Sequence, residues 1–544
     1  MSEIKRYTFL KSRSGENIPA FILPNGDTHP LHSTIDPIKE AQRLIASSGK
    51  NDFLIFLGLG GGFAPLAALE NTNSRVIAID FNKTEIEELL AGMDYSKLLN
   101  NSRFNLLVDF PPQEIKTFIM ENFNPSLYNG IKTIPLRARI DQDTEKFNSI
   151  TAIIKEAIDA VSGDYSVQAH FGIRWFSNII SNIQSAEKQN SGFLTEIKKR
   201  GIKNAAIAAA GPSLDTQLTS LARFKSQGGF IISSDTALRV LLHNNIEADA
   251  VVSIDCQYIS YYHFHGLNMR HIPLILDIAS PPLLCGLSSA PVFFSSGHPL
   301  CRYLNSNWKH FPYLDTSGGN VTYACLSLAE YLGAQNITLF GADFSYVKSQ
   351  SYARGTYIYP YFHNRQNRLS SLEAQMSRFL YRSPFLPQEN EQKNYYETSQ
   401  LRFYRKKLEE KVSGMSSSVT CEAGLGARIY LENSSCKKRK EDDDKIIYDN
   451  NISGKEFLET YRDDILTLPQ ASDKENYLLK LNVKEKQIFT TLLPLMAAVK
   501  KRNPQLEFKD LTAEAKRRSA GKIDLILTNW SFYKNFTSSL LADS

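Results

Sequence analysis

The feature that most limits the fold is an apolar run that leads directly into a glycine turn. Residues 205–210 are all small or apolar, and Gly211-Pro212-Ser213 follows at once. The run predicts a fully buried strand, and the turn predicts the start of a helix with Ser213 as its N-cap. Such a turn directs free backbone amides and a helix dipole to one point, which favours a phosphate or another anion. Short turns of this kind also serve as plain strand-to-helix connections.

The same arrangement recurs downstream, where short apolar runs end in Asp, Ser, Gly or His. Segments with helical periodicity lie between several of the runs, as at residues 324–332. This alternation predicts a mostly parallel sheet with helices on both faces, and ligands bind beyond the carboxyl ends of such strands. Some of these polar residues are expected to be only turn formers or helix caps. The runs are 230–234, 250–254, 273–276, 292–294 and 337–340, and they precede Asp235-Thr236, Asp255-Cys256-Gln257, Asp277, Ser295-Ser296-Gly297-His298 and Gly341-Ala342-Asp343.

The length of 544 residues exceeds one ordinary core and predicts two or three domains. The predicted class is α/β: a Rossmann-like domain, a doubly wound α/β domain that resembles sialyltransferases in architecture, and a helical bundle. The charge run at 437–445 is expected to be an exposed linker. The predicted boundaries are 1–147, 148–435 (with a helical connector at 148–200 and a loop excursion at 346–420) and 436–544.

Composition argues against several classes of protein. No stretch approaches the roughly 20 apolar residues of a membrane span, and the first residues lack a secretory pattern. The six cysteines show no CxxC pair, which fits free thiols in a reducing cytoplasm. A net charge of +5 is small for this length and gives no case for nucleic acid. We therefore expect a cytoplasmic protein without nucleic-acid or membrane partners.

The first domain carries a nucleotide-like pattern of its own. An apolar run at 53–57 leads into a turn containing Gly58, Gly60 and Gly62, and the next run ends at Asp80. This is the order of a Rossmann first unit, with an acid placed to meet a ribose, and it also resembles the start of S-adenosylmethionine methyltransferases. The acid usual just before the first glycine of those enzymes is absent. Alternatively, the glycines only allow close strand–helix packing.

The predicted connector places Asn178 and Asn182 on one helix face beside Trp175, which fits a helix packed between domains. Arg174 is a candidate for reaching an anionic ligand from this helix. Further on, the tyrosine-rich segment 351–361 contains Arg354 and predicts a lid or acceptor-binding loop over the sheet edge.

The motifs together resemble the motility-associated factor (Maf) proteins, bacterial glycosyltransferases that place nonulosonic acids on flagellin serines and threonines. The central domain is also similar to methanogen hydroxymethylpterin pyrophosphokinases. The resemblance covers nearly the whole chain, with Ala342 where many members carry Gln and Tyr352 where a His would be unsurprising. It rests on Leu31-His-Ser33-Thr-Ile-Asp36-Pro37, Arg174-Trp175 with Asn178, Gly211-Pro-Ser-Leu214, Ser234-Asp-Thr-Ala237, Ser253-Ile-Asp-Cys-Gln257, Ser317-Gly-Gly-Asn-Val321 and Gly341-Ala-Asp-Phe344.

The resemblance implies a donor that carries both a carboxylate and a phosphodiester, a CMP-activated sugar such as pseudaminic or legionaminic acid. Asp255 is then the preferred base, with Asp235, His263, His265 and His298 as alternatives. Residues expected to bind the phosphate, sugar or nucleotide are Gly211, Pro212, Ser213, Asp215, Thr236, Gln257, His298, Ser317, Gly318, Gly319, Asn320, Asp343 and Arg354.

The alternatives are an ATP-dependent pyrophosphokinase of a pterin-like alcohol, a non-enzymatic flagellin-binding assembly factor and an amino-terminal methyltransferase. No Asp-x-Asp pair stands at a strand end, so a divalent-cation site of that kind is not expected, and metal dependence stays open. Flagellin is the expected protein partner.

Overall fold

The computed structural model describes residues 6–189, 192–289, 291–386, 395–431, 452–471, 477–478 and 480–530. The chain contacts divide it into two compact units, each treated on its own. The first contains Met1–Ile173 and Leu468–Arg517, and the second contains Arg174–Thr467 and Arg518–Ser544. The charge run at 437–445 lies outside the described residues. The three domain boundaries proposed from the sequence stay predictions.

The first unit contains a parallel sheet of four strands, in the order β6-β5-β4-β7, and an antiparallel sheet of three. The predicted Rossmann-like start is confirmed, since β4 leads through the glycine turn into α2 and β5 ends at Asp80. Its strands are β1 (Tyr7–Lys11), β2 (Asn17–Ile22), β3 (Thr28–Pro30), β4 (Phe53–Leu57), β5 (Arg75–Asp80), β6 (Phe104–Val108) and β7 (Ile131–Pro135).

Helices connect the strands of this unit. The apolar faces of the sheet form two clusters of buried residues, one on each side. These helices are α1 (Pro37–Ala46), α2 (Phe63–Asn71), α3 (Lys83–Gly92), α4 (Ser96–Leu99), α5 (Pro112–Asn122) and α6 (Arg137–Ile140).

The second unit is built on a parallel sheet of seven strands in the order β12-β11-β10-β9-β8-β13-β16. The predicted doubly wound sheet is confirmed, and every strand predicted in this region is present. Buried apolar strand residues pack against α13 and α16. The strands are β8 (Asn204–Ala208), β9 (Phe230–Ser234), β10 (Ala250–Ser253), β11 (Leu274–Asp277), β12 (Pro291–Phe294), β13 (Asn336–Phe340) and β16 (Ser418–Cys421), with β14 (Tyr346–Val347) and β15 (Tyr395–Tyr396) forming a separate pair.

Helices link the strands. Within the described part of 346–420 the chain makes three helices and the β14–β15 pair, so this segment holds regular elements as well as loops. The helices and 3-10 turns of this unit are α8 (Gly192–Arg200), α9 (Leu214–Ser226), α10 (Asp235–His243), η1 (Tyr258–Ser260), α11 (Tyr261–Phe264), η2 (Pro282–Leu287), α12 (Pro299–Asn307), α13 (Val321–Tyr331), α14 (Ile358–His363), α15 (Leu372–Leu380) and α16 (Ser399–Gly414).

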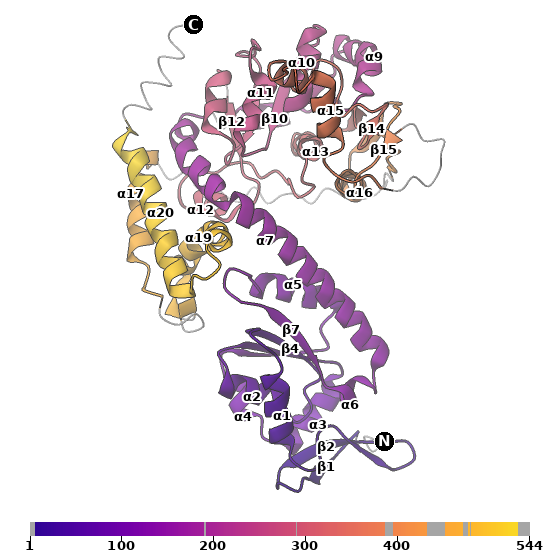
Figure 1. Cartoon of the computed structure of the whole chain (residues 1–544), viewed down its shortest axis with the longest axis vertical. Coiled ribbons are helices and arrows are strands. Elements are labelled where there is room, and N and C mark those ends of the chain that lie inside the picture. The colour runs from indigo at the N-terminus through magenta and orange to yellow at the C-terminus, as the bar shows by residue number, and fades with distance from the viewer. Residues whose placement is uncertain are drawn as a thin grey trace. The chain divides into compact units, whose positions relative to one another are not determined.

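The predicted connector is one continuous helix, α7 (Thr144–Glu187), as Figure 1 shows. The carboxyl-terminal region is helical as predicted, and its helices are α17 (Gly454–Thr467), α19 (Val483–Arg502) and α20 (Phe508–Thr528). Pro494 lies inside α19. Position 172 of α7 requires a glycine, because a Cβ there would lie 1.8 Å from the Pro494 carbonyl oxygen. Among the described helices, none combines the length and apolar character that crossing a membrane requires.

Candidate functional site

The order of the seven strands places a topological switch point between β8 and β13. The chain adds β9 to β12 on one side of β8 and then returns to form β13 on its other side. In open parallel sheets, ligands bind beyond the carboxyl ends of the strands at such a point. The turn Gly211–Ser213 follows β8 and Gly341–Asp343 follows β13, so the two predicted ligand motifs meet here.

The glycine turn after β8 holds a carboxylate of the protein itself. The Ser213 amide donates to Asp343 Oδ2 at 2.7 Å, and the Gly211 amide donates to the Gly341 carbonyl at 2.8 Å. Pro212 has no amide hydrogen to offer. The prediction of free amides for a phosphate is therefore wrong for this turn, because Asp343 and Gly341 already accept from them.

Ser213 also differs from its predicted role as a capping side chain. It stands at the N-cap position of α9, but its hydroxyl makes no capping hydrogen bond there. Instead Ser213 Oγ accepts from the Leu425 amide at 2.9 Å. Gly426 permits this approach, since a Cβ there would lie 2.6 Å from the Cβ of Asp343. The segment after β16 thus closes over the turn, and burial raises the pKa of Asp343.

Asp235 and Asp255 follow the neighbouring strands β9 and β10. Both oxygens of Asp235 are engaged, since Oδ1 accepts from the Thr236 amide at 2.7 Å and Oδ2 from the Ser253 hydroxyl at 2.8 Å. Asp255 Oδ1 accepts from the Gln257 amide at 2.9 Å, while Oδ2 has only a 3.5 Å contact with the Gln257 side chain. Asp255 is therefore the carboxylate with accepting capacity left for a ligand.

The environment of Asp255 makes its carboxylate more basic than that of an exposed aspartate. Burial raises its pKa, and the nearby negative charge of Asp235 raises it further, against the hydrogen bonds from Gln257. Asp277, at the end of β11, is fully buried, and burial raises its pKa to about 6. We did not place Asp277 in the site from the sequence, although its position after a strand was the available signal.

The second glycine turn, Ser317–Asn320, keeps backbone amides available. Asn320 caps α13 by accepting from the Tyr323 amide at 3.0 Å. The amides of Val321 and Thr322 have no acceptor among the described residues, as is usual in the first turn of a helix. This turn, rather than Gly211–Ser213, therefore offers a helix N-terminus to an anion.

Aromatic side chains from the segment after β13 face the same carboxylates. Tyr352 and Tyr357 have ring centroids 6.4 Å apart, and Tyr357 lies edge-on to His263 at 4.2 Å. The charges of Asp235 and Asp255 add to burial in raising the pKa of Tyr357. The tyrosine-rich sequence of 351–361 predicted a lid or acceptor-binding loop here, and that role stays a prediction.

Tyr404 of α16 and Arg382 were missed by sequence reasoning. A Cβ on Gly319 would lie 3.0 Å from the Tyr404 ring, so α16 meets the second glycine turn. Burial raises the pKa of Tyr404, while the charge of Arg382 lowers it and that of Asp255 raises it. No local pattern signals a site residue at either position.

Two further predicted ligand residues, Arg354 and His298, already have partners within the protein. Arg354 is 78% exposed, and its amide donates to Asp215 Oδ1 at 2.9 Å at the start of α9. His298 caps α12 by accepting from the Leu300 amide at 3.1 Å, and its ring lies edge-on to Trp175 at 5.4 Å. Burial lowers the pKa of His298 to about 3, so its ring is neutral.

The two asparagines of α7 hold the loops after β10 and β11. Asn178 Nδ2 donates to the carbonyls of Cys256 and Ala279 at 3.0 and 2.8 Å. Asn182 Nδ2 donates to the carbonyls of Ile278 and Ser280, both at 2.8 Å. The helix therefore fixes the peptide directly after Asp255 and the peptides that follow Asp277.

The amino-terminal glycine turn is filled by side chains of the same unit. The Gly61 amide donates to His32 Nε2 at 2.7 Å, and the Tyr95 hydroxyl donates to the Gly60 carbonyl at 2.5 Å. Burial lowers the pKa of His32 to about 4, so the neutral ring accepts this bond. A Cβ on Gly62 would lie 2.6 Å from Leu98.

Asp80, the expected ribose ligand, is also occupied. Arg139 is fully buried, and its guanidinium lies 2.8 Å from Asp80 Oδ1, while Asp80 Oδ2 accepts from the Leu59 amide. A Cβ on Gly58 would lie 2.8 Å from the Arg139 side chain. Side chains of the same unit thus occupy the possible ligand site at Gly58, Gly60, Gly62 and Asp80. These contacts agree with the alternative in which the glycines only allow close packing of strand and helix.

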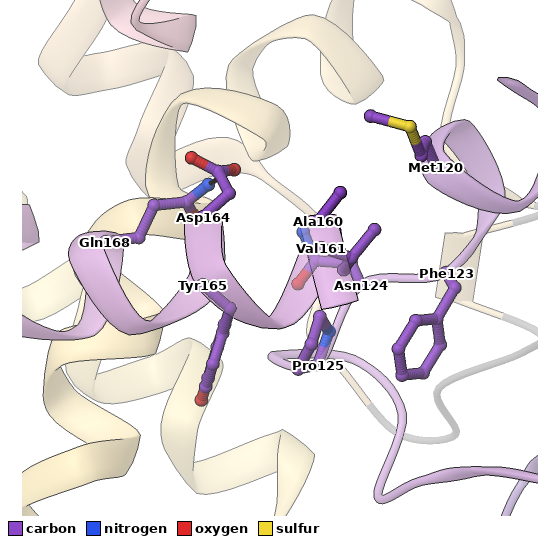
Figure 2. Close-up of a pocket in the computed structure, with 9 residues that line it drawn as sticks. All are labelled: Met120, Phe123, Asn124, Pro125, Ala160, Val161, Asp164, Tyr165 and Gln168. Carbon is purple, nitrogen blue, oxygen red and sulfur yellow. Dashed lines mark hydrogen bonds between the residues drawn. The ribbon is translucent and has the colours of Figure 1, made fainter. Parts of the chain in front are cut away.

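The first unit also has a small cavity of about 160 Å³ between the end of α5 and α7 (Figure 2). Phe123 and Pro125 line it from one side, and Asp164 and Tyr165 from the other. Pockets for drug-sized ligands measure roughly 300–1,000 Å³, so this cavity is too small for a nucleotide sugar.

Comparisons with known proteins agree with this architecture. Residues 177–349 match the family model described as 6-hydroxymethylpterin diphosphokinase MptE-like. The structure of the Maf glycosyltransferase from Magnetospirillum magneticum AMB-1 aligns with 99% of this chain and 93% of that one, with a TM-score of 0.53 and 15% identity. This chain has the fold of that protein. Both resemblances predicted from the motifs are therefore confirmed. The one to hydroxymethylpterin pyrophosphokinases is a match over part of the chain, and the one to the Maf proteins is a shared fold.

Two relatives in Treponema pallidum (strain Nichols), both uncharacterized proteins, are also similar. One is 37% identical over 119 residues, which cover 21% of this chain and 41% of the relative. The other is 30% identical over 146 residues, which cover 25% of this chain and 66% of the relative. The chain thus spans less than two thirds of the length of each.

Proposed function

We propose that this chain is a protein O-glycosyltransferase that moves a nonulosonic acid from a CMP-activated donor to serine or threonine hydroxyls of flagellin in the cytoplasm. The observation that carries the proposal is Asp255, a partly buried carboxylate with a raised pKa at the switch-point edge of the sheet. A base of this kind is what an acceptor hydroxyl needs. The Maf-like fold over the whole chain supports it.

The reaction follows from the placement of the carboxylates. The acceptor hydroxyl oxygen attacks the anomeric carbon of the sugar, its proton passes to Asp255, and the bond from that carbon to the phosphate oxygen breaks. CMP leaves with the electron pair of that bond. The free amides at the start of α13 would stabilise the charge that develops on the phosphate.

Asp235 serves as a positioning residue in this scheme. Its oxygens hold the Ser253 hydroxyl and the Thr236 amide, and its charge raises the pKa of Asp255. We therefore assign proton transfer to Asp255 and the tuning of its pKa to Asp235.

The test is a transfer assay with purified flagellin and a CMP-nonulosonate, read by the mass added to flagellin peptides. Asp255→Asn should lower the rate by at least about 100-fold, the lower range for loss of a general base, while the donor still binds. Asp463→Asn, at an exposed position of α17, is the control and should leave the rate unchanged. Wild-type-like transfer by the Asp255 variant would refute the assignment.

A pyrophosphokinase is the second candidate, and the match of residues 177–349 to the diphosphokinase model favours it. It would move diphosphate from ATP to a pterin-like alcohol. Melting temperatures with CMP and with ATP plus Mg²⁺ separate the two, because a ligand at about 100 times its Kd adds about 2.7 kcal/mol. Stabilisation by CMP favours the glycosyltransferase, and stabilisation by ATP only favours the kinase. No stabilisation by either favours the non-enzymatic flagellin-binding factor.

A further inference from the structure

Arg382 stands just beyond the end of α15 and stacks on an aromatic ring. Its guanidinium lies 4.0 Å over the ring of Phe379, and its side chain is exposed. Within the part of the chain that the structure describes, no carboxylate forms an ion pair with it. By contrast, Arg354 is already engaged at Asp215.

A row of aromatic rings links Arg382 to the carboxylate cluster. The Phe379 ring lies 6.2 Å from Tyr352, Tyr352 lies 6.4 Å from Tyr357, and Tyr357 lies 4.2 Å from His263. Rings packed in this way hold a stacked guanidinium in place at little further cost in side-chain entropy. Arg382 is therefore presented by a packed support rather than by a loose surface chain.

The charges of Arg382 and of the carboxylates act on the same tyrosine hydroxyls. Burial raises the pKa of Tyr352 to about 12, and Arg382 opposes this while Asp235 adds to it. Tyr357 responds to Arg382, Asp235 and Asp255 together. One cation and two carboxylates that act on the same ring suit a ligand with an anionic group next to hydroxyl groups.

We propose that Arg382 binds the oxyanion of the donor, which is the carboxylate of the sugar or the phosphate of the nucleotide. This assignment rests on the proposed glycosyltransferase function and adds the donor-recognition residue to it. A guanidinium presents paired donors in a planar fork that matches either oxyanion. The Gly211 turn does not supply this contact, because its amides are taken by Asp343 and Gly341.

Calorimetric titration of the full chain with three probes tests the proposal: CMP, N-acetylneuraminate and CMP-N-acetylneuraminate. Arg382→Ala should weaken binding of the CMP-sugar about 10- to 100-fold, as expected for a lost charge-assisted pair. Arg382→Lys keeps the charge but loses the planar pair of donors. Its affinity for the CMP-sugar should therefore lie between those of the wild type and Arg382→Ala. Arg378→Ala removes an exposed arginine from the last turn of α15, four residues before Arg382; it is the matched control and should bind as the wild type does.

The probes distinguish the two sources of the anion. A loss confined to the probes that contain the sugar assigns Arg382 to the carboxylate, and an equal loss for CMP assigns it to the phosphate. Wild-type binding of all three probes by Arg382→Ala overturns the inference, as does an equal loss in Arg378→Ala. If the wild type binds neither CMP nor the CMP-sugar, the proposed function itself fails. Unchanged melting temperatures of the variants exclude a loss of folding.

Discussion

The Ser213 amide donates to Asp343 Oδ2 at 2.7 Å, so the glycine turn after β8 holds an internal carboxylate in place of an external anion. The two residues lie 130 positions apart in the sequence. Asp343 thereby ties β8 to β13 at the switch point and fixes the floor of the candidate site.

Asp343→Asn should destabilise the second unit. The carboxylate accepts hydrogen bonds from Ser213 and Gly426, and the amide of Asn would turn a donor toward one of these donors. An unsatisfied buried group costs about 1–3 kcal/mol. Denaturant unfolding measures this loss, with Asp463→Asn as the exposed control. An unchanged midpoint would show that the bond contributes nothing net.

Asp277→Asn should change how stability depends on pH. Burial raises the pKa of Asp277 from 3.8 to about 6, so the folded chain binds the proton more tightly than the unfolded chain. Native stability therefore gains as pH falls from above 6 toward 4, by up to about 3 kcal/mol, and the Asn variant lacks this gain. Unfolding at pH 8 and at pH 4.5 should give a wild-type-minus-variant difference that rises by about 2 kcal/mol. Parallel curves would contradict this.

Asn178→Ala and Asn182→Ala should each loosen the loops after β10 and β11. Each removes two hydrogen bonds to buried carbonyls, which costs about 1–3 kcal/mol. Because Asn178 holds the carbonyl of Cys256, next to Asp255, its loss should also lower the rate of transfer more than loss of Asn182 does. Unfolding and transfer rates of the two variants and the double variant measure this. Equal transfer rates in the two single variants would show that the hydrogen bond to the Cys256 carbonyl has no special role in catalysis.

His32→Ala should destabilise the amino-terminal unit without affecting the central site. It removes the acceptor of the Gly61 amide and a ring packed at 5.0 Å against Phe63, for about 1–3 kcal/mol. Binding of CMP should stay at the wild-type value. S-adenosylmethionine provides the opposing test: if it stabilises the wild type, the glycine turn is open to ligands and our interpretation of this unit is wrong.

Strands with both faces buried were predictable because they read as unbroken apolar runs. The run at 230–234 coincides with β9, and that at 53–57 coincides with β4. Strands with partly exposed faces, such as β6 and β7, lack this signal and were missed. The three-stranded antiparallel sheet was missed as well.

The site was predictable in its location and less so in its contacts. Asp235 and Asp255 were found because polar residues after parallel strands converge at one edge. The hydrogen bond between the amide of Ser213 in the Gly211 turn and Asp343 could not be predicted, because the two residues are distant in sequence. Arg382 and Tyr404 come from helices inserted between β13 and β16, and only tertiary packing brings them to the edge.

The pairing of β8 with β13 also sets an order of events during synthesis of the chain. β8 finds β9 soon after both have emerged from the ribosome, but its other edge stays unpaired until β13 has been made. The contact of Gly426 with Asp343 comes later still. Until β13 has been made, the nascent chain therefore carries a central strand with one unpaired edge, and the switch point is incomplete. Long-range pairing of this kind is slow, and it delays the appearance of a competent site until most of the polypeptide has been translated.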